Sequence, residues 1–330
     1  MRPFKYSSAT DAVAASKAVS SNRDASFLAG GTNILDLMKE DVARPNELVD
    51  IARISLTQIT PLRSGGVSIG ALAKNTDTAN HPLVRQNYPL LTQAILAGAS
   101  GQIRNMATNG GNLLQRTRCP YFYDVAMPCN KRDPGTGCGA LEGVNRMHAI
   151  FGWSESCIAV HPSDMCIALV ALDAVVKVQG ADGKTRSIPF ADFHRLPGNE
   201  PQKDTNLGHG ELITSIELPK DNFAARSYYL KVRDRASYAF ALVSVAAALE
   251  LEGNKIKQAR VALGGVAHKP WRALETEKML IGKEATAEVF KQAAGAEIKN
   301  AKAFKHNEFK IELSERAIVR ALSMAMNGKA

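Results

Sequence analysis

The sequence has no run of about eighteen apolar residues, which is the length that a helix needs to cross a membrane. We therefore expect no membrane insertion. The first residues, MRPFKYSSATDAVAAS, also lack the apolar core and the small-residue cleavage site of a secretory signal. These residues predict a cytoplasmic protein, unless the chain is exported together with a partner that carries a signal.

Aromatic residues are few, at 6% of the chain, and the sequence has no aromatic RNA-binding signature, zinc-finger spacing or basic run. The net charge of +9 comes from lysines and arginines that are scattered along the chain. This distribution indicates a basic surface and argues against a nucleic-acid partner, while it leaves open a contact with an acidic protein partner.

Hydrophobic patterning predicts an α+β protein with a two-lobed N-terminal domain and a separate C-terminal domain. Asp11–Ser20 suits a helix and Ala25–Ala29 suits a buried strand. After the linker Pro219–Asn222 we expect an antiparallel sheet, with one strand over Tyr238–Leu251, and then three helices. The predicted units are lobe one at about residues 1–54, lobe two at about 55–221, and a C-terminal α+β domain at 222–330.

Residues 115–157 show neither helical nor strand periodicity and are rich in Pro, Gly, Asn and Arg. Irregular loops longer than about 12–15 residues are uncommon in compact domains unless they are functional or disordered. We therefore expect something other than a hydrophobic core to hold this loop in place.

Cysteine is absent from most of the chain, because all five cysteines lie between Cys119 and Cys166. The lack of any C-x-x-C pair excludes the usual zinc knuckle, thioredoxin site and bacterial ferredoxin run. An odd number argues against a disulfide framework, although export would permit bridges. Cys166 has apolar neighbours and suits a buried structural role. The other four, Cys119, Cys129, Cys138 and Cys157, favour a metal site, either a structural zinc or an iron–sulfur cluster.

Two glycine pairs occur in similar settings. LAGGTNIL, from Leu28 to Leu35, places Gly30 and Gly31 between a predicted strand and a helix, and ATNGGNLL, from Ala107 to Leu114, repeats the pattern. Glycine allows tight turns, and the amides at a helix N-terminus attract phosphate. A third element, HPSDM, offers the carboxylate of Asp164 to ligand hydroxyls, or else as a simple helix cap. The three elements together favour a dinucleotide site.

These same segments resemble a known family. AGGTNILDLM, GASGQIRNMATNGGNLLQ, HPSDM, GELITSIELP and KVRDRASYAFALVSVAA resemble the FAD-binding medium subunits of the xanthine dehydrogenase (molybdenum hydroxylase) family, in order and along essentially the whole chain. The resemblance implies a two-lobed FAD-binding domain of the PCMH type over residues 1–221 and a CO-dehydrogenase-flavoprotein-like domain over 222–330.

The cysteine-rich segment resembles one particular branch of this family. LLQRTRCPYFYDVAMPCNKRDPGTGCGALEG, followed by SESCIAVHPSDM, is similar to the branch of bacterial periplasmic aldehyde oxidoreductases, whose flavin subunits carry an extra [4Fe–4S] cluster. The flavin subunit of 4-hydroxybenzoyl-CoA reductase also carries one. The resemblance thus implies a cluster, rather than zinc, on Cys119, Cys129, Cys138 and Cys157.

The resemblance also assigns residues to FAD. The first glycine loop would bind the pyrophosphate from one side and the second from the other side. Asp164 would accept hydrogen bonds from ribityl or ribose hydroxyls. Ile213 would pack on the flavin ring and Lys231 would reach the flavin, although Lys231 also suits a strand-edge surface lysine. The implied FAD contacts are Ala29, Gly30, Gly31, Thr32, Asn33, Ile34, Leu35, Thr108, Gly111, Asn112, Asp164, Ile213 and Lys231.

The resemblance implies an electron-transfer subunit with no catalytic residue of its own. A large molybdopterin subunit would oxidise an aldehyde to the acid, a small subunit with [2Fe–2S] clusters would supply electrons, and FAD would pass them to an external acceptor. It also implies a heterotrimer in the periplasm, reached by co-export with a signal-bearing partner subunit.

Three alternatives stay open. A self-contained flavin oxidase of the PCMH fold often binds FAD covalently through a His or Cys, but no His lies in or next to either glycine loop. The chain could instead be the flavin subunit of a related molybdenum hydroxylase, such as a hydroxybenzoyl-CoA reductase. A non-flavin metal-binding interaction protein would leave the two glycine loops unexplained.

Overall fold

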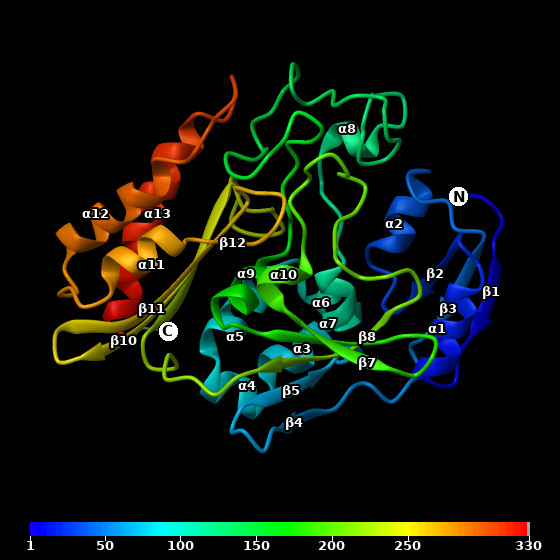
Figure 1. The fold of residues 1–330 in the computed structure, drawn as a ribbon, viewed down its shortest axis with the longest axis horizontal. Helices are drawn as coiled ribbons and strands as arrows, with labels where there is room; N and C mark the ends of the chain where they lie inside the picture. The colour runs from blue at the N-terminus through cyan, green and yellow to red at the C-terminus, as the bar shows by residue number, and fades with distance from the viewer. Residues whose placement is uncertain (329–330) are drawn as a thin grey trace.

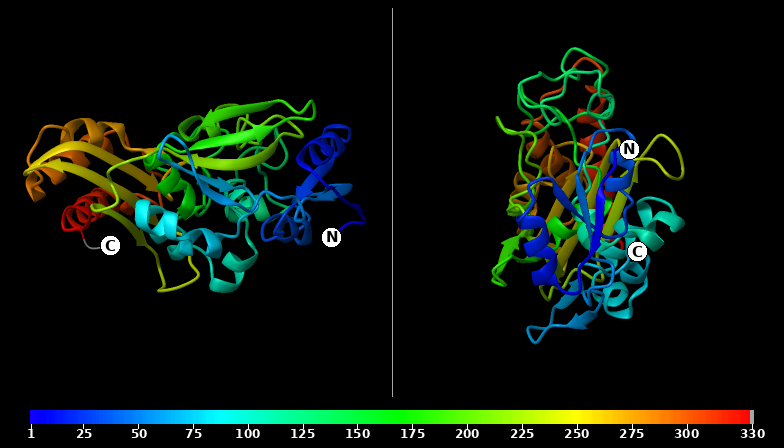
Figure 2. Two further views of the ribbon diagram at one scale, coloured as in Figure 1. Left: turned by 90° about the horizontal axis from the view of Figure 1, so that it is seen from below. Right: turned by 90° about the vertical axis from the view of Figure 1, so that its right-hand side faces the viewer.

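The computed structural model describes residues 1–328 and contains three β-sheets with helices packed around them (Figure 1). The fold is α+β, as the sequence predicts. The first sheet and the C-terminal domain lie at opposite ends of the longest axis, with the second sheet between them (Figure 2). Within residues 1–328, no helix combines the length and the apolar character that a membrane crossing requires.

The first sheet is small and parallel, in the strand order β1-β3-β2. Asp11 caps the first helix by accepting a 2.8 Å hydrogen bond from the backbone amide of Ala14, which explains why the helix begins where the sequence predicts. The elements of this lobe are β1 (Lys5–Ser8), α1 (Ala12–Ser20), β2 (Ala25–Leu28), α2 (Ile34–Lys39) and β3 (Glu47–Asp50).

The second sheet has five antiparallel strands in the order β4-β5-β8-β6-β7. Its strands are β4 (Ile59–Pro61), β5 (Val67–Gly70), β6 (Val175–Gln179), β7 (Thr185–Pro189) and β8 (Leu212–Leu218). Its helices are α3 (Asn75–Asn80), α4 (Pro82–Asn87), α5 (Pro89–Ala97), α6 (Gly101–Met106), α7 (Asn109–Leu113), α8 (Pro120–Tyr123), α9 (Asp164–Ala171) and α10 (Phe190–Phe193).

The C-terminal domain is an antiparallel sheet, in the order β12-β11-β10-β9, with three helices. One face of this sheet packs against the helices, while the other face joins the core of the second lobe through Tyr229, Ala246 and Ala262. The elements are β9 (Ser227–Val232), β10 (Val243–Glu252), β11 (Lys255–Gly264), β12 (Trp271–Arg272), α11 (Leu274–Leu280), α12 (Ala287–Ile298) and α13 (Phe309–Met326).

The strand predicted over Tyr238–Leu251 begins later, at Val243. The preceding residues form a turn in which the Arg235 guanidinium donates a 3.1 Å hydrogen bond to the carbonyl oxygen of Tyr238. Tyr238 has a φ of 50°, in the left-handed region. A bulky residue in that region cannot continue a strand, so the prediction is wrong for Tyr238–Leu242.

The loop of residues 115–157 lies above the gap between lobe one and the C-terminal helices (Figure 1) and contains only the short helix α8. Its main support is polar: the guanidinium of Arg132 donates hydrogen bonds of 2.9–3.0 Å to the carbonyl oxygens of Tyr121, Phe122 and Asp124. The prediction of a loop without a core is wrong in two places. Phe122 and Cys129 form a small apolar cluster with Leu37, and Ile150 and Phe151 are buried in the core of the C-terminal domain.

The far end of this loop is fastened to the C-terminal domain by buried polar side chains. Lys310 is fully buried, and its Nζ donates hydrogen bonds of 3.0 Å to the carbonyl oxygen of His148 and 2.7 Å to that of Gly265. Asn307, also fully buried, donates 3.2 Å hydrogen bonds to the carbonyl oxygens of His148 and Ala149. We call this pair, Asn307 and Lys310, the C-terminal clamp.

Replacing Lys310 by methionine should remove a pH dependence of stability. Burial lowers the pKa of Lys310 from 10.5 to about 7, so between these values the unfolded chain binds the proton and the folded chain does not. The stability that this group contributes is present above its unfolded pKa and is lost as the pH falls through about 7. Urea unfolding at about pH 7 and about pH 10 should therefore show a difference between wild type and Lys310→Met that grows in favour of wild type as the pH rises.

Lys305→Met provides the control, because Lys305 is an exposed lysine on the same segment. Its difference from wild type should not change with pH. Equal behaviour of the two variants would contradict the assignment of the pH dependence to Lys310.

Candidate cofactor-binding site

The two glycine loops touch each other. The first connects β2 to α2, whereas the second follows α6 and has its two glycines inside the five-residue helix α7, so the segment predicted as a glycine loop is largely a short helix. A Cβ on Gly30 would lie 2.1 Å from the carbonyl oxygen of Met106, just before the second loop, so no larger residue fits there without moving the backbone. Gly31 has a φ of +73°, which favours glycine. The structure thus brings together two segments that lie far apart in the sequence.

The second loop is held by a network of buried amide and hydroxyl groups. Asn112 donates a 2.8 Å hydrogen bond to Oδ1 of Asn75, and Nδ2 of Asn75 donates a 2.9 Å hydrogen bond to Oδ1 of Asn109. The hydroxyl of Ser163 donates to Oδ1 of Asn112, which ties the loop to the HPSDM element. Thr108 caps α7 by accepting a 3.2 Å hydrogen bond from the amide of Gly111. The side chains of Thr108 and Asn112 therefore shape the loop itself.

The side chain of Asn33, in the first loop, has one polar atom that is hydrogen-bonded and one that is not. Its Oδ1 accepts a 3.1 Å hydrogen bond from the backbone amide of Arg116. Its Nδ2 is buried and has no hydrogen-bond partner among residues 1–328. A buried donor without a partner is costly, and a bound ligand with an acceptor oxygen would relieve that cost.

Asp164 and Lys231 form a buried ion pair of 2.8 Å, with side chains that are 8% and 4% exposed. Asp164 begins helix α9 and Lys231 lies on β9, so the pair joins the second lobe to the C-terminal sheet. Tyr229 donates a 2.7 Å hydrogen bond to the same carboxylate, and Nζ of Lys231 also donates a 3.1 Å hydrogen bond to the carbonyl oxygen of Ala97. The interpretation of Lys231 as a surface lysine at a strand edge is wrong in one respect: β9 is an edge strand, but the Lys231 ammonium group is buried and donates two hydrogen bonds.

Tyr229 was not among the predicted residues. The signal was present, since Tyr229 and Lys231 are two residues apart on one strand and therefore point to the same face. Tyr229 is 6% exposed, and burial raises its pKa well above the ordinary value, so its hydroxyl acts as a donor to Asp164.

The remaining predicted residues lie around these contacts. Ile213 is buried in β8 beneath the second glycine loop, 3.7 Å from where a Cβ of Gly110 would be. Thr32 is exposed on the first loop. Ala29 packs at the edge of the lobe-one core, and Ile34 and Leu35 form the first turn of α2.

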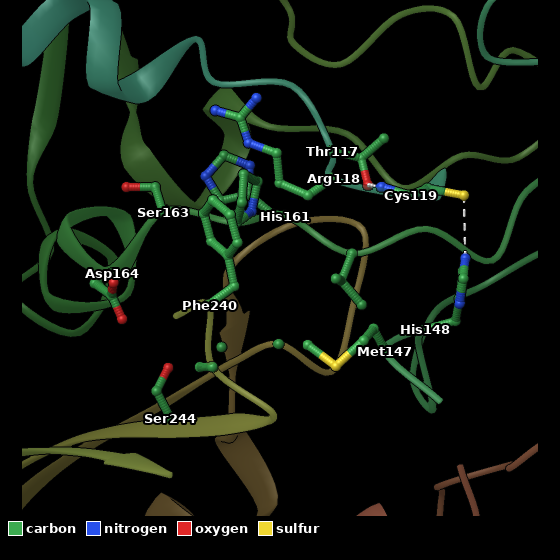
Figure 3. Close-up of a pocket in the computed structure, with 15 residues that line it drawn as sticks. Thr117, Arg118, Cys119, Met147, His148, His161, Ser163, Asp164, Phe240 and Ser244 are labelled. Atoms are coloured by element: carbon green, nitrogen blue, oxygen red, sulfur yellow. Dashed lines mark hydrogen bonds between the residues drawn. The ribbon is translucent and has the colours of Figure 1, made fainter. Parts of the chain in front are cut away.

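A cavity of ≈ 200 Å³ lies between the cysteine-rich loop, the HPSDM element and the C-terminal sheet (Figure 3). Asp164, Ser163 and His161 line it from one side and Phe240 and Ser244 from another. Cys119 and His148 lie at its far end, where the imidazole faces the sulfur (Figure 3). The cavity is therefore continuous from the Asp164 region to the first of the cysteines.

The four cysteines predicted to bind metal line one small cavity. All are free thiols, and Cys166 lies apart in the main core. Burial raises the pKa of Cys119 to about 12 and that of Cys157 to about 11, so these thiols hold their protons unless a metal cation displaces them. The site members are Cys119, Cys129, Cys138 and Cys157.

The spread of the four sulfurs bears on the choice of metal. Among residues 1–328, no three of these four cysteines have sulfurs that all lie within 4.8 Å of one another. Three other side chains meet that distance with their ligand atoms: His161, Cys166 and His194. A tetrahedral zinc with Zn–S bonds of about 2.3 Å would require sulfurs about 3.8 Å apart. An iron–sulfur cluster holds its cysteines farther apart, because irons and inorganic sulfides lie between them.

Charged groups pack beside the cysteine cavity. The Lys131 side chain is 1% exposed and forms an ion pair with Asp204, and its Nζ donates a 2.7 Å hydrogen bond to the carbonyl oxygen of Pro201. Arg116 binds the same carboxylate at 2.8 Å. Burial alone would raise the pKa of Asp204, but Lys131 and Arg116 hold it well below its usual range. These contacts fix the loop and place positive charge near the thiols.

Comparison with known proteins agrees with this geometry. The family described as the FAD-binding domain in molybdopterin dehydrogenase matches residues 2–221, and the CO dehydrogenase flavoprotein C-terminal domain matches residues 228–325. The chain belongs to the FAD-binding subunits of the molybdenum hydroxylase family. Within this family it is the FAD subunit of an oxidoreductase complex.

Two curated relatives and one solved structure support the assignment. The aldehyde oxidoreductase FAD-binding subunit PaoB of Escherichia coli (strain K12) is 49% identical over 98% of this chain and 99% of its own length. The glyceraldehyde dehydrogenase medium chain of Sulfolobus acidocaldarius is 32% identical over 88% of this chain and 85% of its own. A carbon monoxide dehydrogenase from Hydrogenophaga pseudoflava superimposes with a TM-score of 0.78 at 25% identity, covering 100% of this chain and 99% of the other.

The site geometry suits FAD. Gly30 lets the two glycine loops pack backbone against backbone, and the buried Nδ2 of Asn33 offers a donor to a ligand bound there. These features explain how a chain without the G-x-G-x-x-G fingerprint binds a dinucleotide.

Gly30→Ala should weaken FAD binding, because the added methyl group must push the second loop away from the first. Overpacking of this kind costs about 1–3 kcal/mol of folding stability, and the part of this strain that displaces the loops appears as weaker FAD binding. The flavin-to-protein absorbance ratio after dialysis measures the loss. Gly101→Ala is the control, since nothing lies within 4 Å of its added Cβ. Equal flavin retention by the two variants would contradict the role assigned to the loop contact.

Asp164→Asn should destabilise the protein strongly, because it leaves the Lys231 ammonium group buried without its counterion. Removing one partner of a buried ion pair typically costs about 3–5 kcal/mol. Glu312→Gln is the control, since Glu312 pairs with Arg316 on an exposed helix face. Thermal unfolding should show a large fall in midpoint for the first variant and almost none for the second. Similar midpoints would contradict the proposed importance of the buried pair.

Proposed function

We propose that this chain is the FAD- and [4Fe–4S]-containing electron-transfer subunit of a heterotrimeric molybdenum aldehyde oxidoreductase. The observation that carries this proposal is the 49% identity, over nearly the whole length of both chains, to an aldehyde oxidoreductase FAD-binding subunit. The second relative, the medium chain of a glyceraldehyde dehydrogenase, also acts in a complex named for an aldehyde.

The proposed partners are a small subunit with [2Fe–2S] clusters and a large molybdopterin subunit, in which the aldehyde is oxidised to the acid. FAD supplies both one-electron and two-electron redox chemistry, which suits a subunit that links one-electron iron–sulfur carriers to an external acceptor. The chain's own residues bind and orient this cofactor: the glycine loops receive the pyrophosphate, and the Asp164–Lys231 pair joins the two domains beside the cavity.

The [4Fe–4S] cluster would be held by Cys119, Cys129, Cys138 and Cys157. Support comes from the single cavity that all four line. The nearby cations Lys131 and Arg116 would offset part of the negative charge of a thiolate-ligated cluster.

The proposed location is the periplasm, reached by co-export with a signal-bearing partner subunit, with the cytoplasm as the alternative. This proposal follows from the resemblance to the periplasmic branch of the family. Fractionation of cells that express the whole complex, followed by detection of this chain, tests it directly.

The cluster assignment is tested by the pair Cys157→Ser and Cys166→Ser. Serine at position 157 removes a proposed ligand, so we expect iron and acid-labile sulfide to fall to near zero in the purified chain, while bound flavin stays. Serine at position 166 changes a cysteine outside the cavity, so its iron content should equal that of wild type.

Visible spectroscopy before and after anaerobic reduction supplies the second readout. Wild type should show flavin bands over a broad iron–sulfur background, and both should bleach on reduction. Zinc without iron in the wild-type protein would overturn the cluster assignment and leave the flavin assignment intact. A wild-type complex without flavin would overturn the whole proposal.

A further inference from the structure

One of the four cysteines differs from the rest in having a histidine at its sulfur. Nε2 of His148 lies 3.1 Å from Sγ of Cys119 (Figure 3). Within residues 1–328, no other side-chain nitrogen or oxygen makes a recorded hydrogen bond to any of the four sulfurs, and Cys157 receives only the backbone amide of Ala159, at 3.5 Å. The contact between His148 and Cys119 is therefore specific to one corner of the cavity.

The chemistry of a metal-bound cysteine determines the direction of this hydrogen bond. A ligating cysteine is a thiolate, which carries no proton and can only accept. The proton between Nε2 and Sγ must therefore belong to the imidazole, so His148 donates. The other ring nitrogen, Nδ1, is buried without a hydrogen-bond partner and does not compete for this role.

The position of the imidazole is set by the C-terminal domain rather than by the loop alone. The carbonyl oxygen of His148 accepts hydrogen bonds from both members of the C-terminal clamp, Asn307 at 3.2 Å and Lys310 at 3.0 Å. The backbone amide of His148 donates a 3.0 Å hydrogen bond to the carbonyl oxygen of Asn145, and the side chain of Asn145 in turn accepts from the backbone amide of His306. The residue is 2% exposed, so solvent does not replace its contact with Cys119.

We propose that His148 is a positioning residue that raises the reduction potential of the cluster by donating a hydrogen bond to the Cys119 thiolate. This inference rests on the proposed [4Fe–4S] cluster. Reduction by one electron adds one negative charge to the cluster and its thiolates, with no proton transferred and no bond formed or broken. A donor at a ligating sulfur stabilises the more negative state, and hydrogen bonds to sulfur are among the factors that set such potentials.

Two substitutions separate the hydrogen bond from the packing of the ring. His148→Phe keeps an aromatic ring of similar size and removes the donor. His148→Gln shortens the packing surface and keeps an N–H donor. His209→Phe is the control, because His209 is an exposed histidine whose ring nitrogen lies 2.8 Å from the carbonyl oxygen of Val19, in the first lobe.

The measurement is an anaerobic redox titration of the full-length chain with dithionite and mediators, followed by the EPR signal of the reduced cluster, together with iron and sulfide analysis. In His148→Phe we expect unchanged iron and a lower midpoint potential, by about tenfold in the reduced-to-oxidised ratio, which is about 59 mV for a one-electron couple. His148→Gln should recover most of the shift, and His209→Phe should match wild type.

Each other outcome overturns the inference in a recognisable way. Full iron with an unchanged potential in His148→Phe would show that the hydrogen bond does not act on the cluster, while the proposed function would stand. Loss of iron in His148→Phe would make His148 necessary for holding the cluster rather than for its potential. A wild-type protein without a cluster would remove the basis of this inference together with the cluster part of the proposed function.

Discussion

The buried pair of Asp164 and Lys231 is the contact on which the arrangement of the site depends. Every residue of helix α9 is buried, with the C-terminal sheet on one side and helices α5 and α7 of the second lobe on the other, and Asp164 is its first residue. A lone carboxylate or ammonium group at that depth would be prohibitively costly, so each needs the other. Because one partner lies on α9 and the other on β9, the pair links the burial of both charges to the relative position of the two domains.

A chain of specific contacts leads from this pair to the first lobe. Ser163, next to Asp164, binds Asn112 of the second glycine loop, and the residue before that loop, Met106, lies against Gly30 of the first. Hydrogen bonds between buried amides require narrow ranges of distance and angle. A backbone contact too close for a Cβ allows still less displacement of the two segments. The C-terminal domain thereby contributes to the placement of both glycine loops.

The cysteine-rich loop is held mainly by polar contacts, because its sequence has too few apolar residues for a core of its own. Charged side chains hold the loop instead, by donating hydrogen bonds to its backbone carbonyl groups. Arg132 does so from within the loop and Lys310 from outside it. The same arrangement fits a cluster, because a rigid frame and nearby cations both favour a thiolate-rich site. The loop is thus a part of the second lobe that the C-terminal domain holds in place.

Much of this organisation can be predicted from the sequence, because it depends on interactions between residues that are close together in the chain. The strand-to-helix position of Gly30 and Gly31, the start of α1 and the strand β2 follow from local patterns, and the clustering of cysteines in a polar loop indicated a metal site. Tertiary structure decided the rest. Whether Lys231 is exposed or buried depends on a carboxylate 67 residues away, and the late start of β10 depends on a turn that Arg235 and Tyr238 close. The backbone of His148, whose imidazole contacts Cys119, is held by hydrogen bonds from Asn307 and Lys310, 159 and 162 residues away in the chain. Local sequence specifies which side chains are available, but the partner that satisfies a buried charge or a thiolate is set by packing between segments that no sequence pattern connects.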